Sequence, residues 1–410
     1  MNYIDVFAGA SGLSEGFKRS GFNPIAHIEM SQDACNTIKT RIAYHFLKSE
    51  NKLDIYFDYI AGKLETREKL YNEIPSYLLN SVINKTILDD TLNSIFNQID
   101  SLSKTQKEKK IDLIIGGPPC QAYSLVGRSR DPNRMKGDAR NFLFRYYAEF
   151  LKRYKPKIFV FENVLGLLTA GNQTYLNQML ELFDELGYST AIKVLNAEDY
   201  GVLQRRRRVF IVGRRGKTKF HFPELINIEN KWQTKNDLFF DLPRLEPGQE
   251  MHIAKYEKPT NEYLERTELR NGIDFVTQHV TRNHNERDLE IYSIAIKKWL
   301  YEKKRLKYVE LPERLRTHRN TGAFLDRYKV VDPLGHSHTV VAHIAKDGHY
   351  YIYPDQNQVR SISVREAARL QSFPDDYFFE GGRTAAFKQI GNAVPPLMAQ
   401  ALAKQIYQLF

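Results

Sequence analysis

The chain has 410 residues, 42% of them hydrophobic and 27% charged, which is typical of a globular protein of about two domains and excludes wholesale disorder. No apolar run approaches the roughly 18 residues of a transmembrane helix, and no secretory signal is expected at the N-terminus. The cysteines, Cys35 and Cys120, are too few for a disulfide framework or a cysteine-rich zinc site. We therefore predict a cytoplasmic protein without a metal site or a membrane partner.

Basic residues exceed acidic ones and are clustered. Lys and Arg number 60 against 49 Asp and Glu, which gives a formal net charge of +11. Residues 204–219 carry eight basic side chains and no acidic one, and residues 281–330 hold 13 basic against 7 acidic residues. Such clustering favours nucleic acid as a partner. On net charge alone, a basic enzyme without such a partner explains the composition equally well.

Short apolar runs alternate with helical patterns in the first half of the chain. We predict strands at 3–7, 24–30, 111–117, 157–164, 191–197 and 208–213, and helices at 14–20, 141–154 and 174–186. This alternation indicates an α/β fold, a doubly wound and mostly parallel sheet.

Two regions interrupt the alternation. Residues 44–110 are polar and helix-like, and we interpret them as an insertion between two strands. From about residue 217 the sequence becomes aromatic, basic and irregular, before an amphipathic helix at 395–410. We therefore predict one domain from 1–217 plus 386–410, and a second, smaller domain at 218–385.

The first motif is the run Asp5-Val-Phe-Ala-Gly-Ala-Ser-Gly12, where a strand leads into a turn of small residues. Glycines there would let a ligand approach the backbone at the carboxyl edge of the sheet. Glu29, at the end of the second strand, is placed to accept hydrogen bonds from ribose hydroxyls. The glycine spacing differs from the dinucleotide-binding pattern, and this difference favours a nucleoside ligand without a pyrophosphate. A simple tight turn would also explain the glycines.

The second motif, Gly116-Gly-Pro-Pro-Cys120-Gln, follows another predicted strand directly. A lone cysteine is usually a small buried apolar residue, and this interpretation fits Cys35 within a helical pattern. Cys120 lies instead in a Gly-Pro-Pro loop at the predicted ligand edge. A thiolate there would be suited to nucleophilic addition to an electron-poor carbon.

The third motif places Glu162 and Asn163 at the end of a strand of four apolar residues. Partial burial would raise the pKa of the Glu162 carboxyl group and let it hold a proton near neutral pH. The alternative is a purely structural role, in which Asn163 caps a helix and Glu162 lies in its first turn.

A run of four arginines, Arg205 to Arg208, precedes the strand at 208–213. Strand alternation predicts that Arg206 and Arg208 share one face and that Arg205 and Arg207 share the other. One pair could face a reaction centre, and the other could meet phosphates or solvent. Near the C-terminus, Gly391-Asn392 followed by Pro395-Pro396 starts the last helix, so Asn392 could reach a ligand near the first strand.

In this order, DVFAGASG, GGPPCQ, ENV, QRRRR, REAARLQSFP and GNAVPP resemble the motifs of cytosine-C5 DNA methyltransferases. The resemblance implies double-stranded DNA as the substrate, S-adenosylmethionine as methyl donor, and a target-recognition domain at 218–385. It implies that Cys120 is the nucleophile, that Glu162 acts on the base, and that Arg206 and Arg208 are active-site arginines. Matching cofactor positions are Phe7, Gly9, Glu29, Met30, Pro119, Leu143 and Asn392, and Gln121 and Ser124 match the loop that closes over DNA.

Two positions depart from the family pattern. Ser11 replaces a more common glycine, and the acidic residue expected near the adenine of the cofactor is not obvious, with Asp89 and Asp90 as candidates. The resemblance also implies a monomer that protects DNA from a cognate restriction endonuclease. The alternatives are a tRNA cytosine-C5 methyltransferase, a non-catalytic DNA-binding protein with the same fold, and a dehydrogenase.

Overall fold

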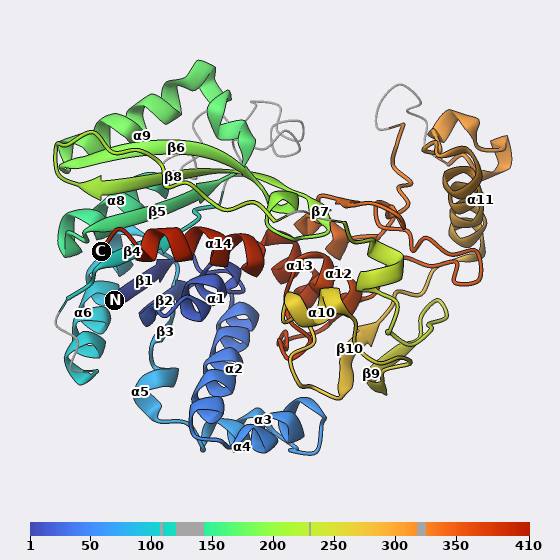
Figure 1. Ribbon diagram of the computed structural model, residues 1–410, viewed down its shortest axis with the longest axis horizontal. Helices are drawn as coiled ribbons and strands as arrows, with labels where there is room; N and C mark the ends of the chain where they lie inside the picture. Colours follow the sequence, from blue (N-terminus) through green and yellow to red (C-terminus); the bar gives the residue numbers. More distant parts are fainter. Residues whose placement is uncertain (107–109, 120–142, 229–230, 318–324) are drawn as a thin grey trace.

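The computed structural model describes residues 1–106, 110–119, 143–228, 231–317 and 325–410. Cys120, Gln121 and Ser124 lie outside the described residues. Figure 1 shows two lobes, one built around a large sheet and one made of shorter elements. Within the described part of the chain, no helix is long and apolar enough to cross a membrane.

The sheet has seven strands in the order β3-β2-β1-β4-β5-β8-β6. Neighbouring strands from β3 to β5 run parallel, whereas β8 runs antiparallel to both β5 and β6. The α/β prediction with a mostly parallel sheet is therefore confirmed. The strands are β1 (Asn2–Val6), β2 (Asn23–Glu29), β3 (Val82–Asn84), β4 (Leu113–Gly116), β5 (Ile158–Asn163), β6 (Tyr188–Asn196) and β8 (Arg207–Arg215).

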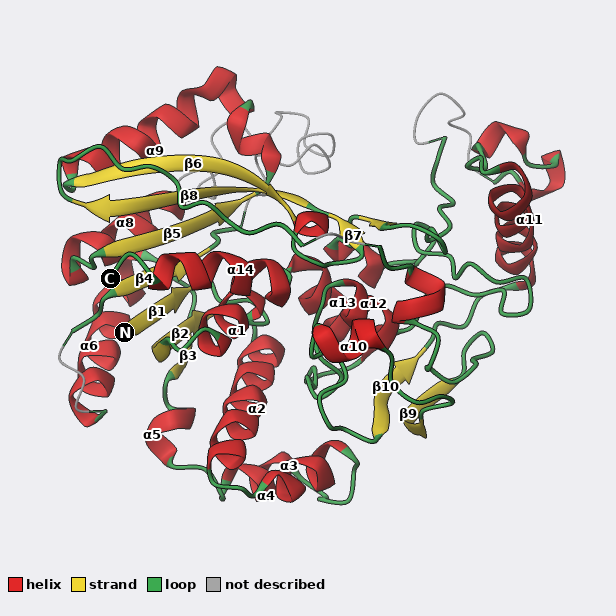
Figure 2. Cartoon of the chain, viewed as in Figure 1, coloured by secondary structure: helices red, strands yellow, loops and turns green. Residues whose placement is uncertain are grey.

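Helices cover both faces of this sheet, which is why the central strand β4 is apolar and buried along its whole length (Figure 2). One core joins the sheet to α6 (Asp89–Thr105), α8 (Leu143–Tyr154) and α9 (Thr174–Glu185). The core on the other face joins it to α1 (Gly12–Arg19) and α14 (Pro396–Tyr407). The first and last helices of the chain thus pack side by side.

The interpretation of residues 44–110 as an insertion is wrong for its second half. β3 adds an edge strand to the sheet, and α6 packs into its core. β3 is only three residues long, too short for an alternating pattern to show in the sequence. The added part is confined to the helices before it, which follow α2 (Gln32–Ser49): α3 (Leu53–Ile60), α4 (Arg67–Tyr71) and α5 (Ser76–Leu79).

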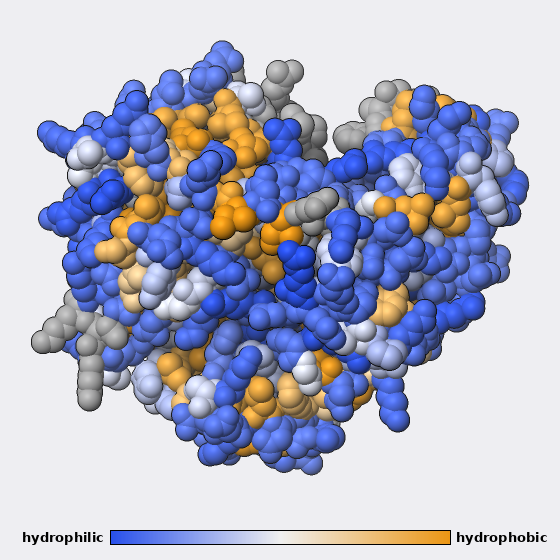
Figure 3. All heavy atoms as spheres, viewed as in Figure 1, coloured by the Kyte–Doolittle hydropathy of each residue, from blue (hydrophilic) through white to orange (hydrophobic). Residues whose placement is uncertain are grey.

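The second lobe is irregular, as predicted, and is tied to the sheet lobe. Its core includes Ala10 and Leu203 from the first lobe, and β7 (Gln204–Arg205) pairs in parallel with β11 (Ser337–His338). Figure 3 shows a recess between the lobes at the upper edge of the view. The longer elements are β9 (Glu250–Lys255), β10 (Phe275–Val280), α10 (Glu262–Arg266), α11 (Glu286–Glu302), α12 (Val364–Leu370) and α13 (Arg383–Asn392).

Candidate active site

The loop between β1 and α1 has an unusual backbone. Phe7, Gly9 and Ser11 all have positive φ angles, of 62°, 56° and 56°, a conformation that non-glycine residues adopt rarely. The Gly9 amide donates a hydrogen bond to Glu29 Oε2 at 2.9 Å, and the Ser31 amide donates to Glu29 Oε1 at 2.8 Å. Glu29 at the end of β2 therefore fixes the loop after β1.

The space in front of this loop is open. A methyl group placed on Gly9 would meet no described heavy atom within 4 Å, so a ligand can approach the backbone here. Each carboxylate oxygen of Glu29 accepts one protein hydrogen bond and keeps capacity for another. The contact predicted between Glu29 and ribose hydroxyls stays a prediction, compatible with this geometry.

The C-terminal motif reaches the same loop because two glycines let α1 and α14 come close. A Cβ atom on Gly12 would lie 2.2 Å from the Val394 carbonyl oxygen, and one on Gly16 would lie 2.4 Å from the Gln400 nitrogen. Asn392, two residues before Val394, ends α13 with its side chain exposed. Asn392 thus lies two residues before a segment that contacts Gly12, and its contact with a ligand stays a prediction.

Gly116, which ends β4, and Gly117, which follows it, also allow neighbouring atoms to come close to the backbone. A Cβ on Gly116 would lie 2.3 Å from the Val6 carbonyl oxygen of β1, and one on Gly117 would lie 2.6 Å from Glu162 Oε2. Only glycine leaves room for the Glu162 carboxylate against this loop. Pro119 is exposed at the end of the described segment and immediately precedes Cys120 in the chain.

Glu162 and Arg208 form an ion pair across adjacent strands. Arg208 Nε lies 3.0 Å from Glu162 Oε1, and both side chains are only slightly exposed, at 12% and 13%. Burial raises the pKa of Glu162, and the positive charge of Arg208 opposes that rise. The carboxyl group therefore holds a proton more readily than an exposed glutamate would.

The arginine run has the alternation that the sequence predicts, since Arg205 and Arg207 are exposed whereas Arg206 is buried and Arg208 is nearly so. The two inward arginines nevertheless differ. Arg206 is completely buried, and burial lowers its pKa. Its guanidinium donates to backbone carbonyls from two distant segments: Val340 at 2.5 Å, Gly391 at 3.2 Å and Ala393 at 2.7 Å.

Two buried glutamines, whose role the sequence did not indicate, add hydrogen bonds among the same chain segments that Arg206 joins. Gln204 donates to Gln371 Oε1 at 2.8 Å and accepts from the Val340 amide at 2.7 Å. Gln371 in turn donates to the Ile390 carbonyl at 2.6 Å. Gln204 lies within the QRRRR motif and Gln371 within the RLQSFP motif. An uncharged polar residue inside a motif is the sequence feature that could have indicated their buried structural role.

The remaining predicted cofactor positions surround the same edge of the sheet. Met30 directly follows β2 and is 65% exposed, whereas Phe7 is partly buried against the sheet core. Leu143 is the first residue of α8. Asp89 and Asp90 are exposed in the first turn of α6, just after β3. The roles of these residues at the cofactor stay predictions.

Cys35 is the buried apolar residue that its sequence context indicates. It is completely buried in α2, and burial raises the pKa of its thiol to about 11. The thiol donates to the Glu29 carbonyl at 3.3 Å. A thiol held in this way is a poor nucleophile near neutral pH.

A family model described as C-5 cytosine-specific DNA methylase matches residues 82–408, which include β4, Glu162, both inward arginines and the C-terminal motif. The chain belongs to this family. The match runs through both lobes of the methylase, so the irregular second lobe is part of the family's domain. It also includes β3 and α6, in agreement with their place in the sheet lobe.

Proteins similar to this methylase include two type II methyltransferases. The type II methyltransferase M.Bpa9945I of Bacillus paralicheniformis is 43% identical, over 99% of this chain and 98% of the relative. The type II methyltransferase M.DdeI of Desulfomicrobium norvegicum is 33% identical, over 100% of this chain and 89% of the relative. A crystal structure of a putative DNA modification methyltransferase from an E. coli prophage shares the fold, with a TM-score of 0.63, 22% identity and coverage of 100% and 99%.

Proposed function

We propose that this methylase transfers a methyl group from S-adenosylmethionine to C5 of a cytosine within a specific site in double-stranded DNA. The observation that carries the proposal is the Glu162–Arg208 pair beside the Gly-Gly-Pro-Pro loop, where Gly117 makes room for the carboxylate. Membership of the C-5 cytosine-specific DNA methylase family supports the reaction class.

The loop after β1 fits a nucleoside-type cofactor. Open space in front of Gly9 gives access to the backbone, and Glu29 keeps acceptor capacity for ribose hydroxyls. Phe7, Met30, Leu143, Pro119 and Asn392 would complete the pocket. When bound, S-adenosylmethionine supplies an electrophilic methyl group on a sulfonium sulfur.

The protein's task is to make C5 of cytosine nucleophilic. We infer that the Cys120 thiolate adds to C6, which forms a carbon–sulfur bond and moves electron density to C5. Glu162, whose pKa is raised by burial, would donate a proton to N3 of the ring while charge develops there, and Arg208 would hold the carboxyl group in place. After C5 is methylated, its proton passes to water, elimination breaks the bond between C6 and the Cys120 sulfur, and N3 returns its proton to Glu162.

A base inside a duplex is out of reach of these groups, so the target cytosine must be flipped out of the stack. The recess between the lobes offers a place for DNA, and residues 218–385 would read the flanking bases. Both relatives described above carry the name type II methyltransferase. By that likeness we propose that the enzyme acts as a cytoplasmic monomer, and that methylation protects DNA from a cognate restriction endonuclease.

Methyl transfer from radiolabelled S-adenosylmethionine to plasmid DNA and to tRNA transcripts tests the substrate class. Bisulfite sequencing of the plasmid then identifies the modified cytosine. We expect label in DNA only, at one cytosine of a recurring short sequence. Label in tRNA and none in DNA would contradict the proposal and favour the tRNA alternative.

A further inference from the structure

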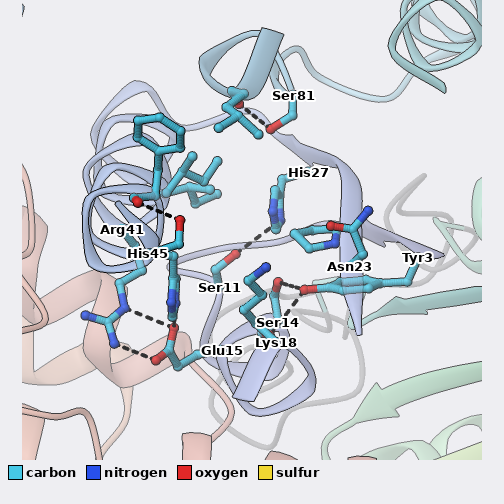
Figure 4. A pocket seen from close by; sticks show the side chains of 16 residues that line it. Tyr3, Ser11, Ser14, Glu15, Lys18, Asn23, His27, Arg41, His45 and Ser81 are labelled. Atoms are coloured by element: carbon cyan, nitrogen blue, oxygen red, sulfur yellow. Dashed lines mark hydrogen bonds and ion pairs between the residues drawn. The ribbon is translucent and has the colours of Figure 1, made fainter. Parts of the chain in front are cut away.

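A cavity lies between α1, α2 and the adjoining strands β1 and β2 (Figure 4). Of the loop after β1, Ser11 lines it. Its volume is about 210 Å³. That is several times the volume of one water molecule and below the size of a typical drug-binding pocket. Phe7, Gly9, Glu29 and Met30 do not line it, so it is distinct from the proposed cofactor site. Its size suits a ligand of one ring or a short chain.

One side of this cavity is apolar. Ile38, Ile42 and Phe46 of α2 face it, together with Pro24 and Leu78. A surface of this kind favours a compact hydrocarbon group over water, since several waters held there would find few hydrogen-bond partners.

The opposite side is polar, and its charges are mostly balanced within the protein. Glu15 Oε1 lies 2.6 Å from Arg41 and 2.9 Å from Arg19, and Oε2 lies 3.0 Å from His45. Arg41 also pairs with Asp376 at 2.8 Å. Neither Glu15 nor Arg41 is therefore available as the main charged partner of a ligand.

Lys18 is different, because its ammonium group has no hydrogen bond or ion pair with any described residue. Its side chain reaches the cavity from α1 (Figure 4). Burial lowers the pKa of Lys18, and the charge of Glu15 opposes this effect only in part, as expected for a partly desolvated cation whose charge is not fully compensated. Ser11 and Ser14 lie on the same polar side and can supply further hydrogen bonds.

We propose that this cavity binds a small amphipathic monoanion, whose carboxylate pairs with Lys18 and whose apolar body packs against Ile38, Ile42 and Phe46. The buried carboxylate of Asp5 would favour a cationic ligand instead, since it lies near the cavity, 3.7 Å from His27 and 3.5 Å from Ser11. It does not itself line the cavity, whereas Lys18 does. The geometry therefore favours an anion over a cation.

Isothermal titration calorimetry of the full chain with three probes of the same shape tests this. Benzoate carries the anion, benzamide is neutral, and benzylamine is a cation. We expect benzoate to bind at least tenfold more tightly than the other two. Lys18→Met, which keeps the aliphatic stem, should reduce benzoate affinity to that of benzamide. Lys52→Met, at an exposed lysine outside the cavity, should leave the affinity unchanged.

A second variant keeps the test decisive if Lys18→Met folds poorly. Ile42→Trp fills the apolar side, so it should abolish the binding of benzoate and benzamide alike. Tighter binding of benzylamine than of benzoate would overturn the charge assignment. Unchanged binding in Ile42→Trp would place the probe elsewhere. Absence of benzoate binding at about 10 mM would mean that the cavity holds only water.

Discussion

At the scale of single residues, the pairing of Glu162 with Arg208 sets the acidity of the proposed general acid. Burial raises the pKa of Glu162, and Arg208 partly offsets that effect. Removing the cation in Arg208→Met should raise the pKa further. Because the protonated form is the active one in our proposal, the rate falls as pH rises through this pKa, so the falling limb should move to higher pH.

Single-turnover methylation rates measured across pH give the position of that limb independently of any loss in absolute rate. The matched control is Arg207→Met, since Arg207 is the exposed neighbour on the other face of the strand. Its limb should not move. A limb that stays in place or moves to lower pH in Arg208→Met would show that Glu162 does not act as the acid.

Arg206 should matter for stability more than for chemistry. Arg206→Met leaves three buried carbonyl groups, on Val340, Gly391 and Ala393, without this donor. We expect the free energy of unfolding to fall by about 2 kcal/mol or more, against about 0.5 kcal/mol or less for Arg207→Met. Urea unfolding measures both. Equal stability of the two variants, with activity lost only in Arg206→Met, would instead place Arg206 in the reaction.

The different surroundings of Arg206 and Arg208 could not be predicted from the sequence. Alternation along a strand predicts that Arg206 and Arg208 share one face, and their burial beside the exposed Arg205 and Arg207 agrees with this pairing. It does not predict what they meet there, because the partners of Arg206 lie 134 to 187 residues further along the chain. Glu162, by contrast, follows an apolar strand directly, so its burial and raised pKa could be predicted locally.

At the scale of elements, the close approach of α1 and α14 holds the C-terminal motif near the first strand. Gly16→Ala would place a methyl group 2.4 Å from the Gln400 backbone nitrogen, so the helices must separate. We expect a loss of about 1–3 kcal/mol in unfolding free energy and weaker binding of S-adenosylmethionine. Gly382→Ala is the control, because its added methyl group meets nothing within 4 Å.

Thermal or urea unfolding with calorimetric binding of S-adenosylmethionine checks this pair of variants. A Gly16→Ala variant as stable as Gly382→Ala would mean that the helices can adjust without cost. If Gly16→Ala loses stability but binds the cofactor normally, then the α1–α14 contact does not position Asn392.

The six longer strands of the sheet and the helices α1, α8, α9 and α14 could be predicted from periodicity, since apolar runs and glycine or proline boundaries set them. The 17-residue helix α11 could not, because it lies in the stretch whose composition indicated irregular structure. β3 could not, because three residues carry no period and pairing with β2 decides its conformation. The predicted domain boundary at 385/386 likewise falls inside α13. The core of the second lobe includes Ala10 and Leu203 from the first, and such shared packing leaves no mark in local composition.

At the scale of the whole molecule, the basic segment that directly follows α11 should serve DNA binding through charge alone. Lys303, Lys304 and Arg305 are all exposed. Replacing all three with glutamine should weaken binding to every DNA sequence. It should also reduce the slope of log affinity against log salt concentration by up to about 3.

Affinities measured at several salt concentrations, on duplexes with and without the methylated site, check this. A triple glutamine variant at Lys104, Lys152 and Lys155, which are exposed on helices α6 and α8 and just after α8, is the control and should change little. A variant at 303–305 that alters site preference while leaving the salt slope unchanged would mean that these residues read bases.

Trapping on DNA that carries 5-fluorocytosine at the target shows whether Cys120 forms a covalent bond to the cytosine. Fluorine at C5 cannot leave as a cation, so elimination is blocked after methylation. We predict an adduct that survives denaturation, requires S-adenosylmethionine, maps by mass spectrometry to Cys120, and is absent in Cys120→Ser but present in Cys35→Ser. An adduct on any other residue, or full turnover by Cys120→Ser, would contradict the account.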